Sequence, residues 1–230
     1  MNLKYTGGFK AAIDLKHVNP ELKVMVAIGG WDDGSKQYSE MVSTPDRRKI
    51  FIDSVVQFIE THQFDGLDLD WEYPGSKDRD GCPEDKENFA SLVEELSVIF
   101  RPRNWLLSAA VPGAVTRIDD GYDVPRLAKV LDFFNVMTYE FHGIWEDFVD
   151  HHSPLWRRSF DLNDTSEFHS DGALSGWIRK GAPADKVIFG LPFFGRGFKL
   201  ADPNKNRPRS AALGIFVDFQ NIIVYFRSKM

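Results

Sequence analysis

Short apolar runs alternate with amphipathic stretches along most of this chain. Each run has the length of a strand, and each amphipathic stretch repeats its apolar residues at helical spacing. The stretch after Thr44, for example, begins with Pro45 and carries Phe51, Val55 and Phe58 on one side. The predicted strands are residues 23–28, 64–74, 105–112, 133–139 and 186–192, and the predicted helices start at residues 45, 83, 124 and 171. This alternation predicts a parallel sheet built from βα units.

Two architectures fit a parallel sheet, an open doubly wound sheet and a closed β/α barrel. No glycine-rich phosphate loop follows the first predicted strand, which disfavours a dinucleotide-binding sheet. Polar and aromatic residues gather where the strands end, at Trp31, Glu72, Tyr139 and Arg196. Both architectures place their sites at that edge. Acidic residues along one strand favour the barrel, whose interior would hold them.

The strand at residues 64–74 carries most of the candidate chemistry. Side chains alternate along a strand, so Asp68, Asp70 and Glu72 share one face and apolar side chains share the other. Burying three acids together is costly unless they are used. Carboxylates in unequal environments are what glycoside cleavage requires. A solvated acidic strand and a magnesium site are the alternatives, but no phosphate-binding element accompanies the acids.

Composition excludes several other classes of function. The net charge is −6 and the basic residues are dispersed, so neither nucleic acid nor an anionic membrane is expected as a partner. The single cysteine, Cys82, excludes an internal disulfide. We expect no signal peptide and no membrane-spanning run in this chain. His142, His151 and His152 lack a zinc-binding pattern, so we expect no metal and no cofactor.

Residues 64–74 resemble the catalytic signature of the family 18 glycoside hydrolases, the chitinases. The pattern Asp-x-x-Asp-x-Asp-x-Glu is matched by Asp65, Asp68, Asp70 and Glu72. Further stretches resemble the third, fifth, sixth and seventh barrel strands of the family, at residues 27–31, 108–112, 137–143 and 190–196. The resemblance implies an α/β fold, a TIM-type (β/α)8 barrel that is incomplete, with about strands three to seven present.

The resemblance also implies a mechanism, substrate-assisted cleavage of β-1,4-linked N-acetylglucosamine with retention. Glu72 would act as general acid and then as general base. Asp70 would orient the acetamido group and stabilise the oxazolinium intermediate, and Asp68 would share a proton with it. Tyr139 resembles the tyrosine that hydrogen-bonds the N-acetyl carbonyl.

The expected partners are chitin or chitooligosaccharides, bound by a monomer. The residues expected to bind them are Trp31, Tyr73, Met137, Glu140, Trp145 and Arg196. Glu140 stands where the family usually has Asp, and Phe194 stands where Tyr is common. By resemblance the protein is expected to be extracellular.

Residues 1–202 are predicted to form the partial barrel, and residues 203–230 a linker and a tail that resembles nothing in the family. Two alternatives to a chitinase remain. One is a non-catalytic chitin-binding lectin, although such relatives typically lose the acid that Glu72 represents. The other is an inactive truncated fragment, because an open barrel leaves strand edges unpaired.

Overall fold

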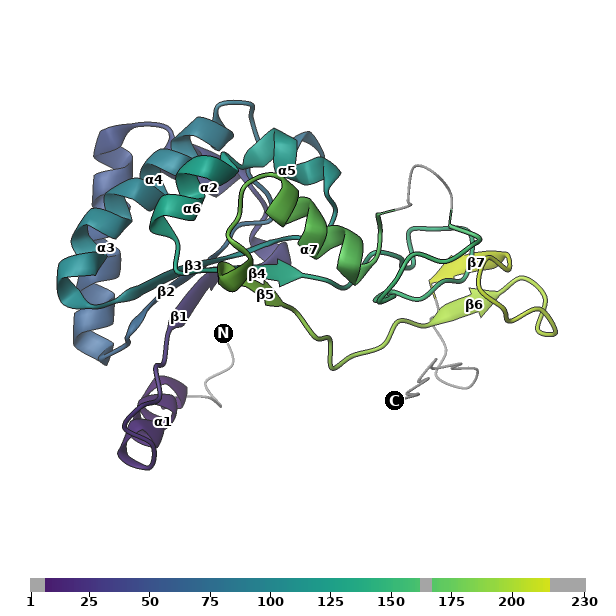
Figure 1. The fold of residues 1–230 in the computed structure, drawn as a ribbon, viewed down its shortest axis with the longest axis horizontal. Coiled ribbons are helices and arrows are strands. Elements are labelled where there is room, and N and C mark those ends of the chain that lie inside the picture. Colours follow the sequence, from purple (N-terminus) through teal and green to yellow (C-terminus); the bar gives the residue numbers. More distant parts are fainter. Residues whose placement is uncertain (1–6, 162–166, 216–230) are drawn as a thin grey trace.

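Five parallel strands form the central sheet and follow one another in the order of the sequence (Figure 1). The computed structural model describes residues 7–161 and 167–215. The strands are β1 (Val26–Gly29), β2 (Gly66–Asp70), β3 (Leu106–Pro112), β4 (Phe133–Met137) and β5 (Val187–Phe189). Each overlaps one of the predicted apolar runs, so the predicted parallel sheet is confirmed.

The sheet does not close into a barrel. Within the described residues, β1 pairs only with β2 and β5 pairs only with β4. A closed barrel would pair its first strand with its last. The predicted incomplete β/α barrel is therefore confirmed, and the carboxyl ends of all five strands meet at one edge.

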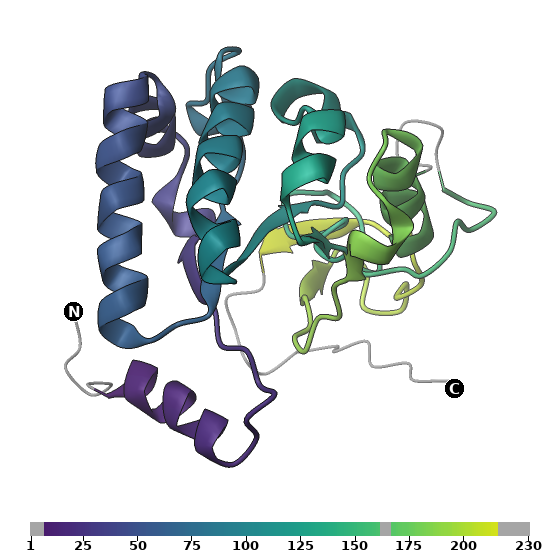
Figure 2. The ribbon, with the colours of Figure 1, turned by 60° about the vertical axis from the view of Figure 1, so that its left-hand side comes forward.

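Helices pack along one face of the sheet (Figure 2). They are α2 (Lys36–Val42), α3 (Pro45–His62), α4 (Asp85–Phe100), α5 (Thr116–Gly121), α6 (Val124–Val130) and α7 (Ser170–Arg179), while α1 (Gly8–Asp14) precedes β1. Leu67 and Leu69 of β2 are buried in the apolar core on the helix side. Asp68 and Asp70 alternate with them and are half-buried. The acids of β2 therefore face the side that the helices leave open.

The starts of two helices test the sequence pattern. Thr44 caps α3, because its side chain accepts the Arg47 N–H at 3.3 Å, and Pro45 is the first helical residue, as predicted. The second long helix begins at Asp85, so the predicted start at Pro83 was wrong. The chain first turns around the buried Asp85 carboxylate, which accepts the Cys82 N–H at 2.8 Å.

A two-stranded antiparallel ribbon lies beyond the sheet, formed by β6 (Phe198–Leu200) and β7 (Ala212–Ile215) (Figure 1). Val149, Phe198 and Ala212 form a small apolar cluster of their own beside it. The ribbon joins residues on both sides of the boundary predicted at residue 202. Most of the predicted tail lies outside the described residues, so the domain division stays a prediction.

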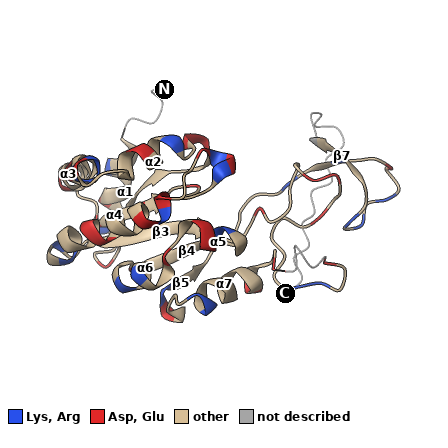
Figure 3. Ribbon diagram, turned by 90° about the horizontal axis from the view of Figure 1, so that it is seen from above, with Lys and Arg blue, Asp and Glu red and all other residues tan. Residues whose placement is uncertain are grey.

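Lys and Arg are interspersed with Asp and Glu along the helices (Figure 3). The described helices thus show no gathered basic face of the kind that nucleic-acid-binding proteins carry. None of the helices in the described ranges is long and apolar enough to cross a membrane. The expected absence of nucleic-acid and membrane partners stays a prediction.

Candidate active site

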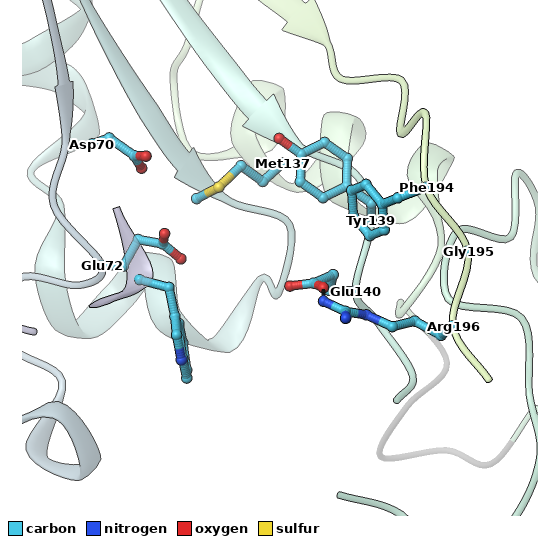
Figure 4. Close-up of a pocket in the computed structure, with 9 residues that line it drawn as sticks. Asp70, Glu72, Met137, Tyr139, Glu140, Phe194, Gly195 and Arg196 are labelled. Carbon is cyan, nitrogen blue, oxygen red and sulfur yellow. Dashed lines mark ion pairs between the residues drawn. The ribbon is translucent and has the colours of Figure 1, made fainter. Parts of the chain in front are cut away.

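A pocket of about 440 Å³ opens at the carboxyl edge of the sheet (Figure 4). Most of its lining residues were predicted from the sequence. The lining consists of Trp31, Asp70, Glu72, Met137, Tyr139, Glu140, Phe194, Gly195 and Arg196. These residues come from the ends of β1, β2 and β4 and from the segment after β5, so the pocket depends on the parallel order of the sheet.

Glycines at the end of β1 let the chain pass directly against the backbone of Asp70. Gly29 has φ 116°, and a Cβ atom there would lie 2.0 Å from the Asp70 carbonyl oxygen. The next residue, Gly30, donates its N–H to the same oxygen at 2.8 Å. Only glycine fits this close approach, which delivers Trp31 to the pocket immediately afterwards.

Asp68 lies deeper along β2 and is not part of the pocket lining. The register places it opposite Ser108 of β3. The Ser108 hydroxyl donates to Asp68 Oδ1 at 2.5 Å, and Asn135 Nδ2 of β4 donates to the same oxygen at 2.8 Å. Two neighbouring strands thus hold the innermost carboxylate in one orientation.

Asp70 lies above Asp68 on the same face and lines the pocket. Its Oδ1 atom is buried and has no hydrogen-bond partner among the described residues. Burial, followed by the charge of Asp68, raises the pKa of the Asp70 carboxyl. A raised pKa favours the protonated carboxyl. The Oδ1 atom can carry the proton without losing a hydrogen bond, because it has none among the described residues.

Glu72 lies beyond the last residue of β2, which ends at Asp70. The prediction that the strand continues to residue 74 was therefore wrong. Trp71 explains the local path, because its buried indole donates to Ser35 Oγ at 2.9 Å and ties the chain to the loop after β1. Glu72 still reaches the pocket beside Asp70 (Figure 4).

Glu72 as a residue is only 9% exposed. Burial and then the charge of Asp70 raise its pKa, whereas a hydrogen bond from Tyr73 and the positive charges of Arg79 and Arg117 act in the opposite direction. The two pocket carboxyls therefore have different surroundings. Asp70 faces another acid below it, while Glu72 has a hydroxyl donor and two cations nearby.

Met137 and Tyr139 form the opposite side of the pocket, at the end of β4. A Cβ atom at Gly190 would lie 2.9 Å from the Tyr139 ring, so glycine leaves room for that ring. The Tyr139 ring meets Phe194 edge-on, with 5.8 Å between the centroids. Burial, followed by the charges of Asp70 and Glu72, raises the pKa of the Tyr139 hydroxyl, which therefore stays protonated and able to donate.

Glu140 and Arg196 form an ion pair at the rim of the pocket (Figure 4). Both side chains are more than one-third exposed. Glu140 has φ 58°, which turns the chain sharply after Tyr139. The rim therefore joins the end of β4 to the segment after β5.

Two predicted substrate-binding residues are not brought to the pocket. Tyr73 lies outside the lining, with the Arg117 guanidinium 5.1 Å from its ring centroid. Trp145 is 61% exposed, and its ring lies close to Gly143 instead. The prediction missed Phe194 and Gly195 as lining residues, although both follow a predicted strand that ends at the same edge.

The three loop histidines do not form a metal site with other residues. Within the described parts of the chain, no three His, Cys, Asp or Glu side chains are grouped to hold a metal ion. His142 Nδ1 instead lies 2.9 Å from Glu146 Oε1.

Known proteins are similar to this chain in sequence and in fold. The model of the glycosyl hydrolases family 18 matches residues 2–226. An endochitinase of Manduca sexta is 44% identical over 213 residues, which cover 92% of this chain and 38% of that protein. The chain thus spans well under half the length of that relative.

Many solved structures share the fold. A Group IV chitinase of Ostrinia furnacalis in complex with allosamidin has a TM-score of 0.86 and 39% identity, over 90% of this chain and 56% of that one. Human YKL-39, described as a pseudo-chitinase with retained chitooligosaccharide binding, has a TM-score of 0.84 and 34% identity, over 93% of this chain and 59% of that one.

Proposed function

Because the chain belongs to family 18 of the glycosyl hydrolases, we propose that it is a chitinase that cleaves β-1,4-linked N-acetylglucosamine with retention. The observation that carries this proposal is a pair of pocket carboxyls, Asp70 and Glu72, in unequal surroundings. Unequal carboxyls separate the acid from the stabilising group. The substrates are chitin or chitooligosaccharides, and the protein acts as a monomer outside the cell.

Glu72 is the general acid in this proposal. Its raised pKa keeps a proton available for the glycosidic oxygen as the bond to the anomeric carbon breaks. The acetamido oxygen of the substrate attacks that carbon and forms an oxazolinium ion. Glu72, now ionised, removes a proton from a water molecule that attacks the anomeric carbon and opens the oxazolinium ring. Glu72 thereby regains the proton that it gave to the leaving group.

Asp70 and Asp68 support the charged intermediate. Asp70, which lines the pocket, accepts the acetamido N–H with its carboxylate and stabilises the positive charge. Asp68, fixed by Ser108 and Asn135, shares one proton with Asp70 and so controls its charge. Tyr139 donates its hydroxyl to the acetamido carbonyl oxygen, which aims that oxygen at the anomeric carbon.

The rest of the proposed set binds sugar rings. Trp31 is 54% exposed at the pocket and offers an aromatic face for stacking. Met137 contacts the acetamido methyl group, and Arg196 and Glu140 offer charged hydrogen-bonding groups at the rim. Tyr73 acts on the reaction through its hydrogen bond to Glu72. The exposed Trp145 can contact a longer sugar chain.

A chitin-binding lectin is the second candidate, favoured by the similarity to YKL-39. The presence of a buried glutamate at residue 72 argues for the enzyme. An inactive fragment is the third candidate, because the edge strands β1 and β5 leave the sheet open within the described residues.

One experiment separates these candidates. The purified chain is incubated with a fluorogenic chitooligosaccharide beside Glu72→Gln and, as a control, Glu60→Gln on the surface of α3. We expect turnover by the parent and the control, and a loss of about 10²-fold to 10⁴-fold in Glu72→Gln. Binding of chitotetraose without turnover would indicate the lectin. Absence of binding together with a non-cooperative thermal transition would indicate the fragment.

A further inference from the structure

Arg79 contacts both the aromatic side of the pocket and the chain at Glu72. It ends the short helix η4 (Lys77–Arg79), in the loop after β2. Its guanidinium lies over the Trp31 ring, 3.7 Å from the centroid. Nη2 donates to the carbonyl oxygen of Trp31, and Nε donates to that of Glu72 at 3.3 Å. One side chain thus joins two residues that the sequence separates by 41 positions.

The loop that carries Arg79 is itself firmly held. The Ser35 N–H donates to the Arg79 carbonyl oxygen at 3.1 Å, so the loop is tied to the chain just after Trp31. Asp85, which is fully buried, accepts N–H groups from Gly75 at 3.1 Å and from Cys82 at 2.8 Å. The guanidinium therefore projects from a fixed base rather than from a free surface loop.

The contact leaves Trp31 with one face for a ligand. Trp31 lines the pocket and Arg79 does not, so the guanidinium covers the ring face that points away from the pocket. A cation over one face of an indole is favourable, and a planar guanidinium stacks where an ammonium cannot. Fixing the ring before the ligand arrives lowers the entropy cost of binding.

We propose that Arg79 is a positioning residue. It clamps the Trp31 ring from one face, which leaves the other face free for stacking, and it fixes the position of that ring relative to Glu72. The proposal rests on the proposed function, because it assigns the free face of Trp31 to a sugar ring of the substrate. Arg79 itself touches neither the sugar nor the reacting atoms. Its charge also lowers the pKa of Glu72, together with Tyr73 and Arg117, which adds a second measurable effect.

The first test measures chitotetraose binding by titration calorimetry in Arg79→Lys, Arg79→Ala, Trp31→Ala and the double variant Arg79→Ala/Trp31→Ala. We expect Arg79→Ala to weaken binding about fivefold, the loss that a cation–π contact of ordinary strength predicts. Arg79→Lys should weaken binding less, because an ammonium keeps the cation–π attraction but lacks the planar stacking of the guanidinium. In the Trp31→Ala background, Arg79→Ala should have no further effect. Additive losses, or parent-like binding by Arg79→Lys and Arg79→Ala, would overturn the proposal.

The matched control is Arg103→Ala, because Arg103 lies over Trp105 with 5.5 Å to the ring centroid, at the other end of the sheet. It should leave chitotetraose binding unchanged. Thermal unfolding of every variant checks that the fold is kept, and Arg79→Lys serves if Arg79→Ala does not fold.

A second measurement does not depend on sugar binding. Acrylamide quenching of tryptophan fluorescence should rise in Arg79→Ala, because the second face of Trp31 becomes accessible, and should not rise in a Trp31→Phe background. Unchanged quenching would contradict the clamp. If the parent binds no chitotetraose, the proposed function fails, and quenching still decides whether the clamp exists.

Activity gives a third readout. If the chain turns over substrate, the basic limb of its pH profile should move to higher pH in Arg79→Ala and stay in place in Arg79→Lys, which keeps the charge. A purely structural role for Arg79 would move neither limb.

Discussion

The two sides of the pocket are built in different ways. The acid wall, which we define as Asp70 and Glu72 with Asp68 below them, follows a strand that has a neighbour on both sides. The loop wall, defined as Tyr139, Glu140 and residues 194–196, depends on β5, which pairs only with β4 within the described residues. Glu72 is 9% exposed, whereas Phe194 of the loop wall is 42% exposed.

This difference suggests that the two walls have different roles, one in the chemistry and one in ligand recognition. Ser108 of β3 and Asn135 of β4 hold the Asp68 carboxylate, and Gly30, just after β1, holds the Asp70 backbone, so these two residues keep their positions without a ligand. Proton transfer benefits from such preorganised groups. Phe194, Glu140 and Arg196 of the loop wall are each more than one-third exposed, and segments of that kind open at low cost. Chemistry would then belong to the rigid wall and ligand recognition to the adaptable one.

Matched glycine substitutions should give the largest contrast. Gly29→Ala forces a Cβ atom into the Asp70 carbonyl oxygen at a positive φ, so we expect a loss of about 3 kcal/mol in the free energy of unfolding. Gly197→Ala, which follows the loop wall and has nothing within 4 Å of its added Cβ, should change it by less than about 0.5 kcal/mol. Urea unfolding measures both. Equal losses would show that the two walls are equally constrained.

Acidic pH should stabilise the acid wall. Asp70 and Glu72 have raised pKa values, so above about pH 4 the folded chain retains protons that the unfolded chain has released. Their contribution is therefore fully present below that pH and is lost as the pH rises through the folded-state pKa values. Asp70→Asn cannot ionise, and we expect its Tm at pH 7 to exceed that of the parent by about 2–4 °C, the effect of about 1 kcal/mol.

The control for this pH effect is Asp53→Asn, the same chemical change at an exposed carboxylate of α3. Thermal unfolding between pH 4 and pH 8 should show parallel curves for the parent and Asp53→Asn, and a flatter curve for Asp70→Asn. A parent whose stability rises across this range, with Asp70→Asn parallel to it, would contradict the assigned pKa direction.

The sequence predicted the strand order and most of the pocket, because apolar runs and their polar ends are local signals. Apolar residues at residues 133–137 mark a buried strand, so Tyr139 had to lie at its carboxyl end. The predicted strand was too long, because β2 ends at Asp70, although Trp71 and Glu72 keep the sides that alternation predicts. The hydrogen bond from Trp71 to Ser35 ends the strand there, and it joins segments that lie 36 residues apart.

Side-chain contacts between different strands could not be predicted in the same way. The bond from Asn135 to Asp68 requires β3 to lie between β2 and β4 at one particular offset, which no local pattern specifies. Tyr73 follows Glu72 immediately, yet it lies outside the pocket lining, with the Arg117 guanidinium over its ring. Trp145 lies in a long loop whose path depends on distant contacts.

Removing one hydroxyl from the loop wall should weaken ligand binding without reaching the acids. We expect Tyr139→Phe to bind chitotetraose about five-fold to tenfold more weakly, the cost of one lost hydrogen bond. Phe194→Leu removes the ring that meets Tyr139 and keeps the hydroxyl, so it should have a smaller effect. Titration calorimetry measures both. A larger loss in Phe194→Leu would mean that ring packing, not the hydroxyl, determines recognition.

The smallest effect should come from the rim ion pair. Glu140 and Arg196 are both partly exposed, and exposed pairs contribute little because solvent screens them. A double-mutant cycle with Glu140→Gln and Arg196→Gln should give a coupling below about 0.5 kcal/mol in urea unfolding, comparable to the exposed pair of Lys49 and Asp53. A coupling well above about 1 kcal/mol would mean that the pair holds the loop wall as firmly as the strands hold the acid wall. In that case recognition would rest on a second rigid surface, and the contrast between the two walls would not hold.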